Sequence, residues 1–275
     1  MPGGEAVTAA DTARAALEAL RGGEPVVSVV VIDGEGAAPG RRMLVWRERR
    51  AGSLGDPALD ARAEAAARAL LSGEGRSGPR ALEGGCTLYL EAHHPPPELV
   101  IVGAGHIARP LCRLGAMLGF RVRVLDDRPE FATRERFPEA EEVRRADFSD
   151  PFRGVPVGPE THLVLVTRGH RYDYEALRDV LRRPVEPAYV GMIGSRRRVR
   201  AALEQLSREG IDPERMARVH APVGLDIGAE TPEEIALAIA AEIIRVRRGG
   251  TGLPLRDRER VMERWIDPAP RSAEP

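Results

Sequence analysis

The sequence contains no lysine and no asparagine, so all 41 of its basic residues are arginine. A phosphate-binding loop of the Walker A type needs a lysine, and so do Schiff-base aldolases and enzymes that use pyridoxal phosphate. A protease of the Cys-His-Asn type needs an asparagine. The composition therefore excludes these mechanisms before any motif is considered.

Cysteine is also rare, because Cys86 and Cys112 are the only two and they do not form a CxxC pair. They indicate neither a disulfide framework nor a cysteine zinc site, and they fit a reducing compartment. The chain has no apolar run of about 18 residues, and its N-terminus lacks the basic and apolar regions of a signal peptide. We therefore expect a cytoplasmic protein that does not associate with membranes.

The acidic and basic residues almost balance, at 42 and 41. The chain therefore lacks the excess of positive charge that is typical of nucleic-acid binding, so we expect no nucleic-acid partner. The sequence contains neither GxSxG nor HExxH, and it shows no set of carboxylates and histidines with metal-ligand spacing. We therefore predict no catalytic residues and no metal ligands.

Two regions of the chain differ in their pattern of expected elements. Residues 1–94 mix helices with β-branched strands and predict a small α/β domain. The segment HHPPP at 93–97 marks the boundary, because consecutive prolines favour an extended, stiff chain. From 95 to 252 apolar strands alternate with amphipathic helices, which is typical of a parallel sheet covered on both faces. A charged, proline-rich tail is expected at 253–275.

The expected elements follow from hydrophobic periodicity and turn signals. In the first domain they are helices at 8–21 and 57–71, strands at 25–33, 41–46 and 86–92, and a loop at 72–80. In the second they are strands at 98–102, 121–126, 162–167 and 188–191, and helices at 106–118, 172–182, 196–209 and 231–247.

A glycine-containing turn follows the first strand of the second domain. The sequence VIVGAGHIA gives Gly103, Gly105 and Ala108 the spacing of a dinucleotide-binding fingerprint. The first glycine makes the tight turn, the second lets the backbone approach a pyrophosphate, and the small third residue lets the helix pack on the strand. The next strand ends at Asp126, which can accept a hydrogen bond from a ribose 2′-OH, and Arg128 can tolerate a 2′-phosphate. NAD and NADP are both open, as is a turn kept only for packing.

Histidines and a carboxylate lie close to the expected carboxyl edge of the sheet. His106 is in the glycine turn, where the helix end favours a neutral imidazole that can contact a ligand. His170 and Asp173 follow the third parallel strand, and ligands of open α/β sheets bind at this edge. A purely local hydrogen-bonding role is the alternative for His106.

Two further turns carry candidate binding residues. In GMIGSRRR, Gly194 and the N-cap Ser195 precede four arginines that begin with Arg196. Cations at a helix N-terminus oppose the helix dipole, so we expect a shared anion such as phosphate, with a solvated arginine-rich face as the alternative. A third turn contains Gly224 and Asp226. Three such turns at one edge predict a cleft that holds more than one small ligand.

The motifs LVIVGAGHIA, VLDDRPEFATRERFPEA, GMIGSRRR and HAPVGLDIGAETPEEIALAIAAEII occur in this order between residues 98 and 247. Together they resemble the XdhC/CoxI family, accessory proteins that mature xanthine dehydrogenase, carbon monoxide dehydrogenase and related molybdenum hydroxylases. The resemblance implies a Rossmann-type parallel-sheet domain preceded by a smaller mixed α/β domain.

The resemblance also implies a function and its partners. A protein of this family binds the molybdenum cofactor, as molybdopterin or its dinucleotide, assists its sulfuration and delivers it to an apo-enzyme. The implied partners are an apo molybdenum hydroxylase and a cysteine desulfurase, and a homodimer is a further expectation. The residues that match the family's turns are Gly103, Gly105, His106, Asp126, Arg128, His170, Asp173, Gly194, Ser195 and Arg196.

Two positions depart from the family pattern. The family commonly has Thr-His-Asp-His after its strand, whereas this chain has Thr167-Arg168-Gly169-His170 and retains only the second histidine. The family's first domain usually carries a Gly-Ser-x-x-Gly-Gly-Cys-x-Glu loop, and here Ala58 takes the place of the cysteine. Without that thiolate, this loop cannot ligate sulfur or molybdenum directly.

Two other functions are compatible with the sequence. One is an NAD(P)-dependent oxidoreductase with His170 or His106 as general acid or base. The other is a divergent, non-catalytic scaffold of the same family, which the missing cysteine favours. The absence of a clear catalytic constellation favours the accessory function over the oxidoreductase.

Overall fold

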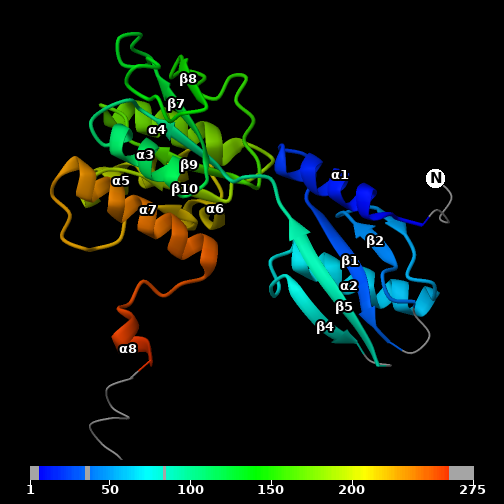
Figure 1. Ribbon diagram of the computed structural model, residues 1–275. Helices are drawn as coiled ribbons and strands as arrows, with labels where there is room; N and C mark the ends of the chain where they lie inside the picture. The colour runs from blue at the N-terminus through cyan, green and yellow to red at the C-terminus, as the bar shows by residue number, and fades with distance from the viewer. Residues whose placement is uncertain (1–5, 35–37, 83–84, 260–275) are drawn as a thin grey trace, which may run out of the picture. The chain divides into compact units, whose positions relative to one another are not determined.

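The computed structural model describes residues 6–34, 38–82 and 85–259. The chain divides into two compact units, Met1–Pro96 and Pro97–Pro275, each with its own sheet (Figure 1). The division falls within the HHPPP segment. Residues 260–275, which make up most of the expected tail, lie outside the described part.

The first unit is an antiparallel sheet between two helices, with strand order β3-β2-β1-β5-β4. Its elements are α1 (Ala9–Leu20), β1 (Val26–Asp33), β2 (Arg42–Val45), β3 (Arg50–Gly52), α2 (Pro57–Leu71), β4 (Gly78–Leu82) and β5 (Cys86–His93). Val27 and Val29 pack in the cluster that contains α2, whereas Val26 packs with α1. Both faces of β1 are therefore covered, which explains its almost unbroken apolar run.

The expected loop at 72–80 is wrong from Gly78 onward, because β4 begins there and pairs with β5 at the edge of the sheet. Only alternate residues of β4 are partly buried. A half-exposed edge strand that contains glycine and proline gives a weak signal in the sequence.

The second unit is a six-stranded parallel sheet with strand order β11-β10-β9-β6-β7-β8. Its strands are β6 (Glu98–Val102), β7 (Arg121–Asp126), β8 (Glu142–Arg145), β9 (Thr161–Leu165), β10 (Tyr189–Met192) and β11 (Val219–His220). Its helices are α3 (Ala108–Met117), α4 (His170–Arg182), α5 (Arg196–Arg208), α6 (Pro213–Ala217), α7 (Pro232–Arg248) and α8 (Leu255–Glu259). Counted from β6, the strand order is 3-2-1-4-5-6, that of a doubly wound Rossmann sheet, so the expected fold class is confirmed.

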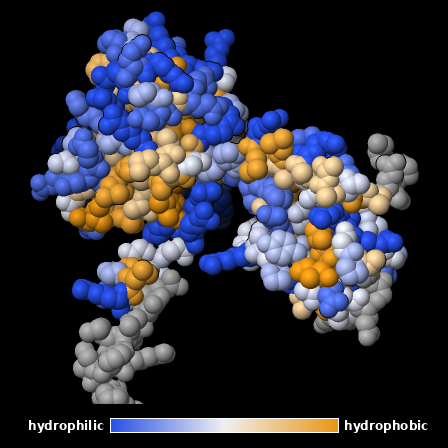
Figure 2. All heavy atoms as spheres, viewed as in Figure 1, coloured by the Kyte–Doolittle hydropathy of each residue, from blue (hydrophilic) through white to orange (hydrophobic). Residues whose placement is uncertain are grey.

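Helices cover both faces of this sheet. Leu99 and Ile101 of β6 belong to a core cluster with α3 and α7, whereas Val100 and Val102 belong to a cluster with α4 and α5. Because successive side chains of a strand point to opposite faces, β6 contributes to the hydrophobic cores on both sides of the sheet. The outer side of α7 is apolar, with Leu237 exposed by 51%, and Figure 2 shows this apolar surface. None of the described helices is long and apolar enough to cross a membrane.

Candidate functional site

The candidate site lies at the carboxyl edge of the parallel sheet, where the chain changes direction between β6 and β9. In this strand order, the connections leave these two adjacent strands toward opposite ends of the sheet, which creates a crevice between their carboxyl ends. The glycine turn follows β6, and the turn containing Thr167 follows β9. The fold thus places the expected nucleotide turn at the topological switch point.

The two glycines of this turn have different surroundings. Gly103 has φ +110°, and a Cβ atom there would lie 2.5 Å from the carbonyl oxygen of Val166. A Cβ atom at Gly105 would meet nothing within 4 Å. Gly103 is therefore required by the close approach of β6 and β9, whereas Gly105 keeps open the space that a pyrophosphate would need.

Asp126 supports the glycine turn from inside the protein. Its carboxylate is 1% exposed and accepts hydrogen bonds from the backbone N–H of Ala104 at 2.7 Å and of Arg128 at 3.0 Å. The Arg128 guanidinium donates two more, both at 2.9 Å. Burial would raise the pKa of Asp126, but the hydrogen bonds from Arg128 and Ala104 hold it below its usual value. A ribose 2′-OH would have to displace one of these donors.

An ion pair crosses the sheet edge beside the glycine turn. Arg168, which follows β9, donates to Asp127, which follows β7, at 2.5 and 2.8 Å. Because β6 lies between β7 and β9, this pair spans the end of β6. Arg168 also donates to the hydroxyl of Tyr172 at 3.1 Å. The arginine that replaces the family's first histidine is thus held across the crevice.

A hollow of about 200 Å³ opens between the turns that follow β9 and β10. Thr167 and Asp173 line it from the β9 side, and Gly194 and Arg198 line it from the β10 side. Asp173 is buried and accepts the backbone N–H of Thr167 at 3.1 Å, which fixes the shape of the turn. Pockets for whole small molecules measure about 300–1,000 Å³, so this hollow suits one anionic group rather than a complete dinucleotide.

The helix that follows β10 begins with a cluster of cations. Ser195 caps it by accepting the backbone N–H of Arg198 at 3.4 Å. Within the described ranges, the exposed side chains of its first two turns have no ion-pair partner; they are Arg196, Arg197, Arg198 and Arg200. The three in the first turn, Arg196 to Arg198, are each unfavourable beside the helix N-terminus by about 0.3–1 kcal/mol, which a bound anion would offset. Arg198 lines the hollow, whereas Arg196 lines a separate depression.

The remaining predicted residues lie apart from this hollow. His106 is exposed beside the glycine turn. His170 is the first residue of α4, and its side chain lies outside the described part. Gly224 has φ +108° and packs against α7, whereas Asp226 is exposed in the next loop. Of the three predicted turns, only the one that contains Gly194 lines this hollow, and the turn after β9 forms its other wall. The glycine turn lies beside Thr167 but does not line the hollow, and neither does the turn that contains Gly224.

Glu242, which sequence analysis missed, anchors the third turn. Its carboxylate is buried and accepts the hydroxyl of Tyr189 at 2.8 Å and the backbone N–H of Gly224 at 2.7 Å. The Nδ1 atom of His220 lies 3.2 Å away. Burial would raise the pKa of Glu242, but the hydrogen bonds from His220, Gly224 and Tyr189 lower it to about 2. The sequence offered one signal for this role, because Glu242 is an acidic residue next to Ile243 on the apolar side of the last long helix.

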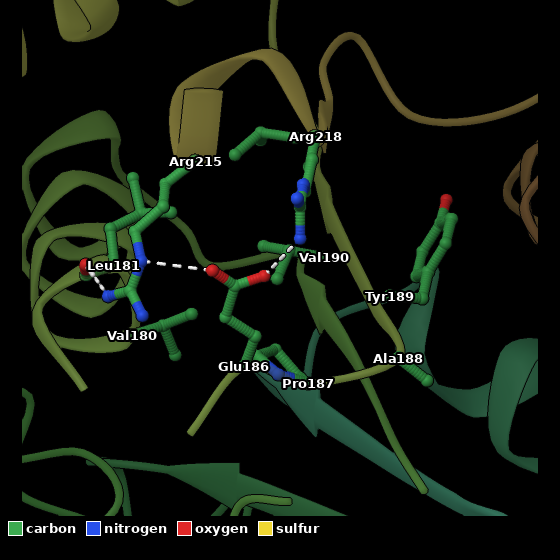
Figure 3. Close-up of a pocket in the computed structure, with 10 residues that line it drawn as sticks. Val180, Leu181, Glu186, Pro187, Ala188, Tyr189, Val190, Arg215 and Arg218 are labelled. Carbon is green, nitrogen blue, oxygen red and sulfur yellow. Dashed lines mark hydrogen bonds and ion pairs between the residues drawn. The ribbon is translucent and has the colours of Figure 1, made fainter. Parts of the chain in front are cut away.

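A smaller hollow of about 140 Å³ lies at the opposite edge of the sheet, near the start of β10. The Glu186 carboxylate accepts hydrogen bonds from Arg215 at 3.0 Å and from Arg218 (Figure 3). Arg215 also donates to the carbonyl oxygen of Leu181 at 2.7 Å. Because these charged groups pair with one another, we assign them a structural role in holding α4, α6 and β10 together.

Neither cysteine is exposed to solvent. Cys86 and Cys112 are buried, and burial raises the pKa of Cys112 to about 11. Ala58, at the family's cysteine position, is exposed in the first turn of α2. No three His, Cys, Asp or Glu side chains among the described residues come together as a metal site.

Two protein-family models match the chain, one in each unit. The model described as "XdhC Rossmann domain" matches residues 99–243, and the model described as "XdhC and CoxI family" matches residues 19–82. A crystal structure of a xanthine dehydrogenase from Bacillus halodurans has the same fold, with a TM-score of 0.52 and 20% identity, and the match covers 83% of this chain and 93% of that one.

Two curated proteins are similar in sequence. "Uncharacterized protein YqeB" of Escherichia coli K12 is 36% identical over 170 residues, which are 62% of this chain and 31% of that protein. A probable xanthine dehydrogenase subunit of Bacillus subtilis 168 is 32% identical over 161 residues, 58% of this chain and 46% of that protein. The chain thus spans less than half the length of either relative. Because the Rossmann-domain match alone covers more than half of the chain, this protein belongs to the XdhC family.

Proposed function

We propose that this protein is an accessory protein for the maturation of a xanthine dehydrogenase type of molybdenum hydroxylase. It binds the molybdenum cofactor at the carboxyl edge of its parallel sheet and delivers it to the apo-enzyme. Family membership and the similarity to the probable xanthine dehydrogenase subunit support this role. The observation that carries it is the hollow between β9 and β10, which is lined by Arg198, a guanidinium with no ion-pair partner in the described part of the chain.

The residues present fit the phosphate-bearing parts of the cofactor. Arg198 and the backbone around Gly194 would hold the phosphate of molybdopterin. The open space above Gly105 would hold the pyrophosphate of the dinucleotide form. When bound, the cofactor carries the redox-active molybdenum that the client enzyme uses. The described residues of this chain bind and orient it.

The residues do not fit direct sulfur transfer by this chain. Ala58 has no thiol, and both cysteines are buried. Sulfur for the cofactor would therefore come from a partner such as a cysteine desulfurase. Hydrogen bonds fill the Asp126 carboxylate, so the ribose of any nucleotide at the glycine turn, that of NAD included, would have to displace one of its donors.

Replacing Arg198 with alanine should weaken retention of the cofactor about ten- to a hundredfold, because one hydrogen bond to a charged group contributes about 1.5–3 kcal/mol. The measurement is the fluorescence of oxidised pterin released by acid from protein purified from cells that make the cofactor. Arg200→Ala is the matched control, since Arg200 is exposed on the same helix but lines a different depression. Equal pterin in the wild type and Arg198→Ala would contradict the proposed phosphate contact.

Replacing Gly105 with valine should abolish nucleotide binding while the fold is retained. The new side chain enters space that is open in the protein but is needed by a pyrophosphate. Binding of ADP, measured by calorimetry, should fall below detection, whereas the melting temperature should change by only about 2–4 °C. If ADP binds the wild type and Gly105→Val equally well, the turn serves packing alone.

A further inference from the structure

The surface groove between α4 and α5 has no role in the proposed function. It measures about 960 Å³, and its walls include Arg171, Tyr174 and Arg178 of α4 and Arg197, Ala201 and Gln205 of α5. Alanine on the α5 wall leaves room between the two helices. The groove begins beside the cofactor hollow, because Arg198 lines both.

The net charge of the groove is positive. Four arginines and one glutamate line it, and the glutamate is used by the ion pair between Arg171 and Glu175 at 3.0 Å. Arg178, Arg197 and Arg198 form no ion pair with any described residue. Glu209, at the far end, is already engaged by the hydroxyl of Tyr174 and by Arg182. The groove therefore presents three guanidinium groups that lack an ion-pair partner, although Arg178 is close enough to Glu209 to help lower the pKa of that carboxyl.

These positive charges are spread along the groove. Both helices begin at the carboxyl edge of the sheet and follow parallel strands, so they run in the same direction. Arg197 is in the first turn of α5, whereas Arg178 is in the third turn of α4. At 1.5 Å per residue, the two levels differ by about 10 Å. An extended peptide, which rises about 3.3 Å per residue, spans this difference with three or so residues.

We propose that the α4–α5 groove docks an acidic, extended segment of a partner protein. Aspartate or glutamate side chains of that segment bind Arg197 near the carboxyl edge and Arg178 farther along, through charge-assisted hydrogen bonds. Because the groove adjoins the hollow, a partner held there lies next to the proposed cofactor site. The docking surface itself does not depend on which cofactor that site binds.

The test uses a fluorescein-labelled peptide rich in glutamate, with a second peptide in which glutamine replaces every glutamate. Anisotropy at low ionic strength measures binding to the wild type, Arg178→Glu and Arg197→Glu. Arg200→Glu is the control, because it changes the net charge equally and lies on the same helix but outside the groove. We expect the two groove variants to bind the peptide at least about tenfold more weakly, and binding to Arg200→Glu to stay within about threefold of the wild type.

Several outcomes would overturn the proposal. They are a wild type that does not bind the glutamate peptide, a glutamine peptide that binds equally, and an Arg200→Glu variant that weakens binding as much as Arg197→Glu. Displacement of the peptide by inorganic phosphate at an equal concentration would instead assign the groove to small anions. Arg178 does not line the hollow, so pterin retention is also measured for Arg178→Glu. This measurement distinguishes a failure of the groove proposal from a failure of the proposed cofactor site.

Discussion

Replacing Glu242 with alanine is expected to lower the free energy of unfolding by about 3–5 kcal/mol. The change removes the acceptor of the buried Tyr189 hydroxyl and of the partly buried Gly224 N–H. A buried donor without a partner costs about 1–3 kcal/mol. Urea denaturation at neutral pH measures the loss. Glu233→Ala is the control, because Glu233 is exposed on the same helix and its removal should cost less than about 1 kcal/mol.

The Glu242 carboxylate also makes stability depend on pH. Its pKa is lowered from 4.5 to about 2 in the folded protein. A lowered pKa stabilises the fold fully above the unfolded value, and this contribution is lost as the pH falls from about 4.5 toward 2. The lost contribution amounts to about 3 kcal/mol. Glu242→Gln should lack this part of the acid sensitivity, and an unchanged dependence of the unfolding free energy on pH would contradict the assignment.

Loss of Glu242 should also act on the candidate site. The carboxylate joins α7 to the backbone of Gly224 and to the side chain of His220. The loop that follows contains Asp226, and it would lose this attachment to the helix, which leaves the 3.2 Å hydrogen bond from the Leu225 N–H to the Ala238 carbonyl oxygen. We therefore expect faster amide hydrogen exchange in residues 221–231 of Glu242→Ala than in the control.

The sequence was sufficient to predict the elements whose local pattern is strong. The strands that became β6 and β9 are buried on both faces, so they read as apolar runs, and α7 begins with a capping box at Thr231 and Glu234. The sequence did not reveal β8 or β11. Strand β8 is a half-exposed edge rich in Arg and Glu, and β11 has only two residues. Such strands are defined by their neighbours rather than by their own periodicity.

The candidate site was predictable as a set of turns, but not as a set of contacts. The motif identified Asp126, but nothing in the sequence showed that Arg128 and Ala104 would occupy its carboxylate. The arginine run identified a cation cluster, but residues 196 and 198 differ by about 200° around a helix. That rotation directs Arg198 to the hollow and Arg196 to another depression. Side-chain direction therefore limited the prediction more than residue type did.

Replacing Gly103 with alanine should destabilise the protein by about 4 kcal/mol. The backbone there has φ +110°, which costs a residue with a side chain about 1–3 kcal/mol. The new Cβ atom would also lie 2.5 Å from the Val166 oxygen and 2.9 Å from the Thr167 Cα atom. These are backbone atoms, and Val166 is held by a 2.8 Å hydrogen bond to Val102, so relief requires the strands to separate.

Gly105→Ala is the matched control for this change, since its Cβ atom meets nothing within 4 Å and its φ is not in the left-handed region. Its unfolding free energy should stay within about 1 kcal/mol of the wild type. Urea denaturation of the two variants compares them directly. A large loss for Gly103→Ala alone would assign the first glycine to the packing of β6 against β9 and leave the second for the ligand. Equal losses would contradict this division, because the second glycine would then also be needed for folding.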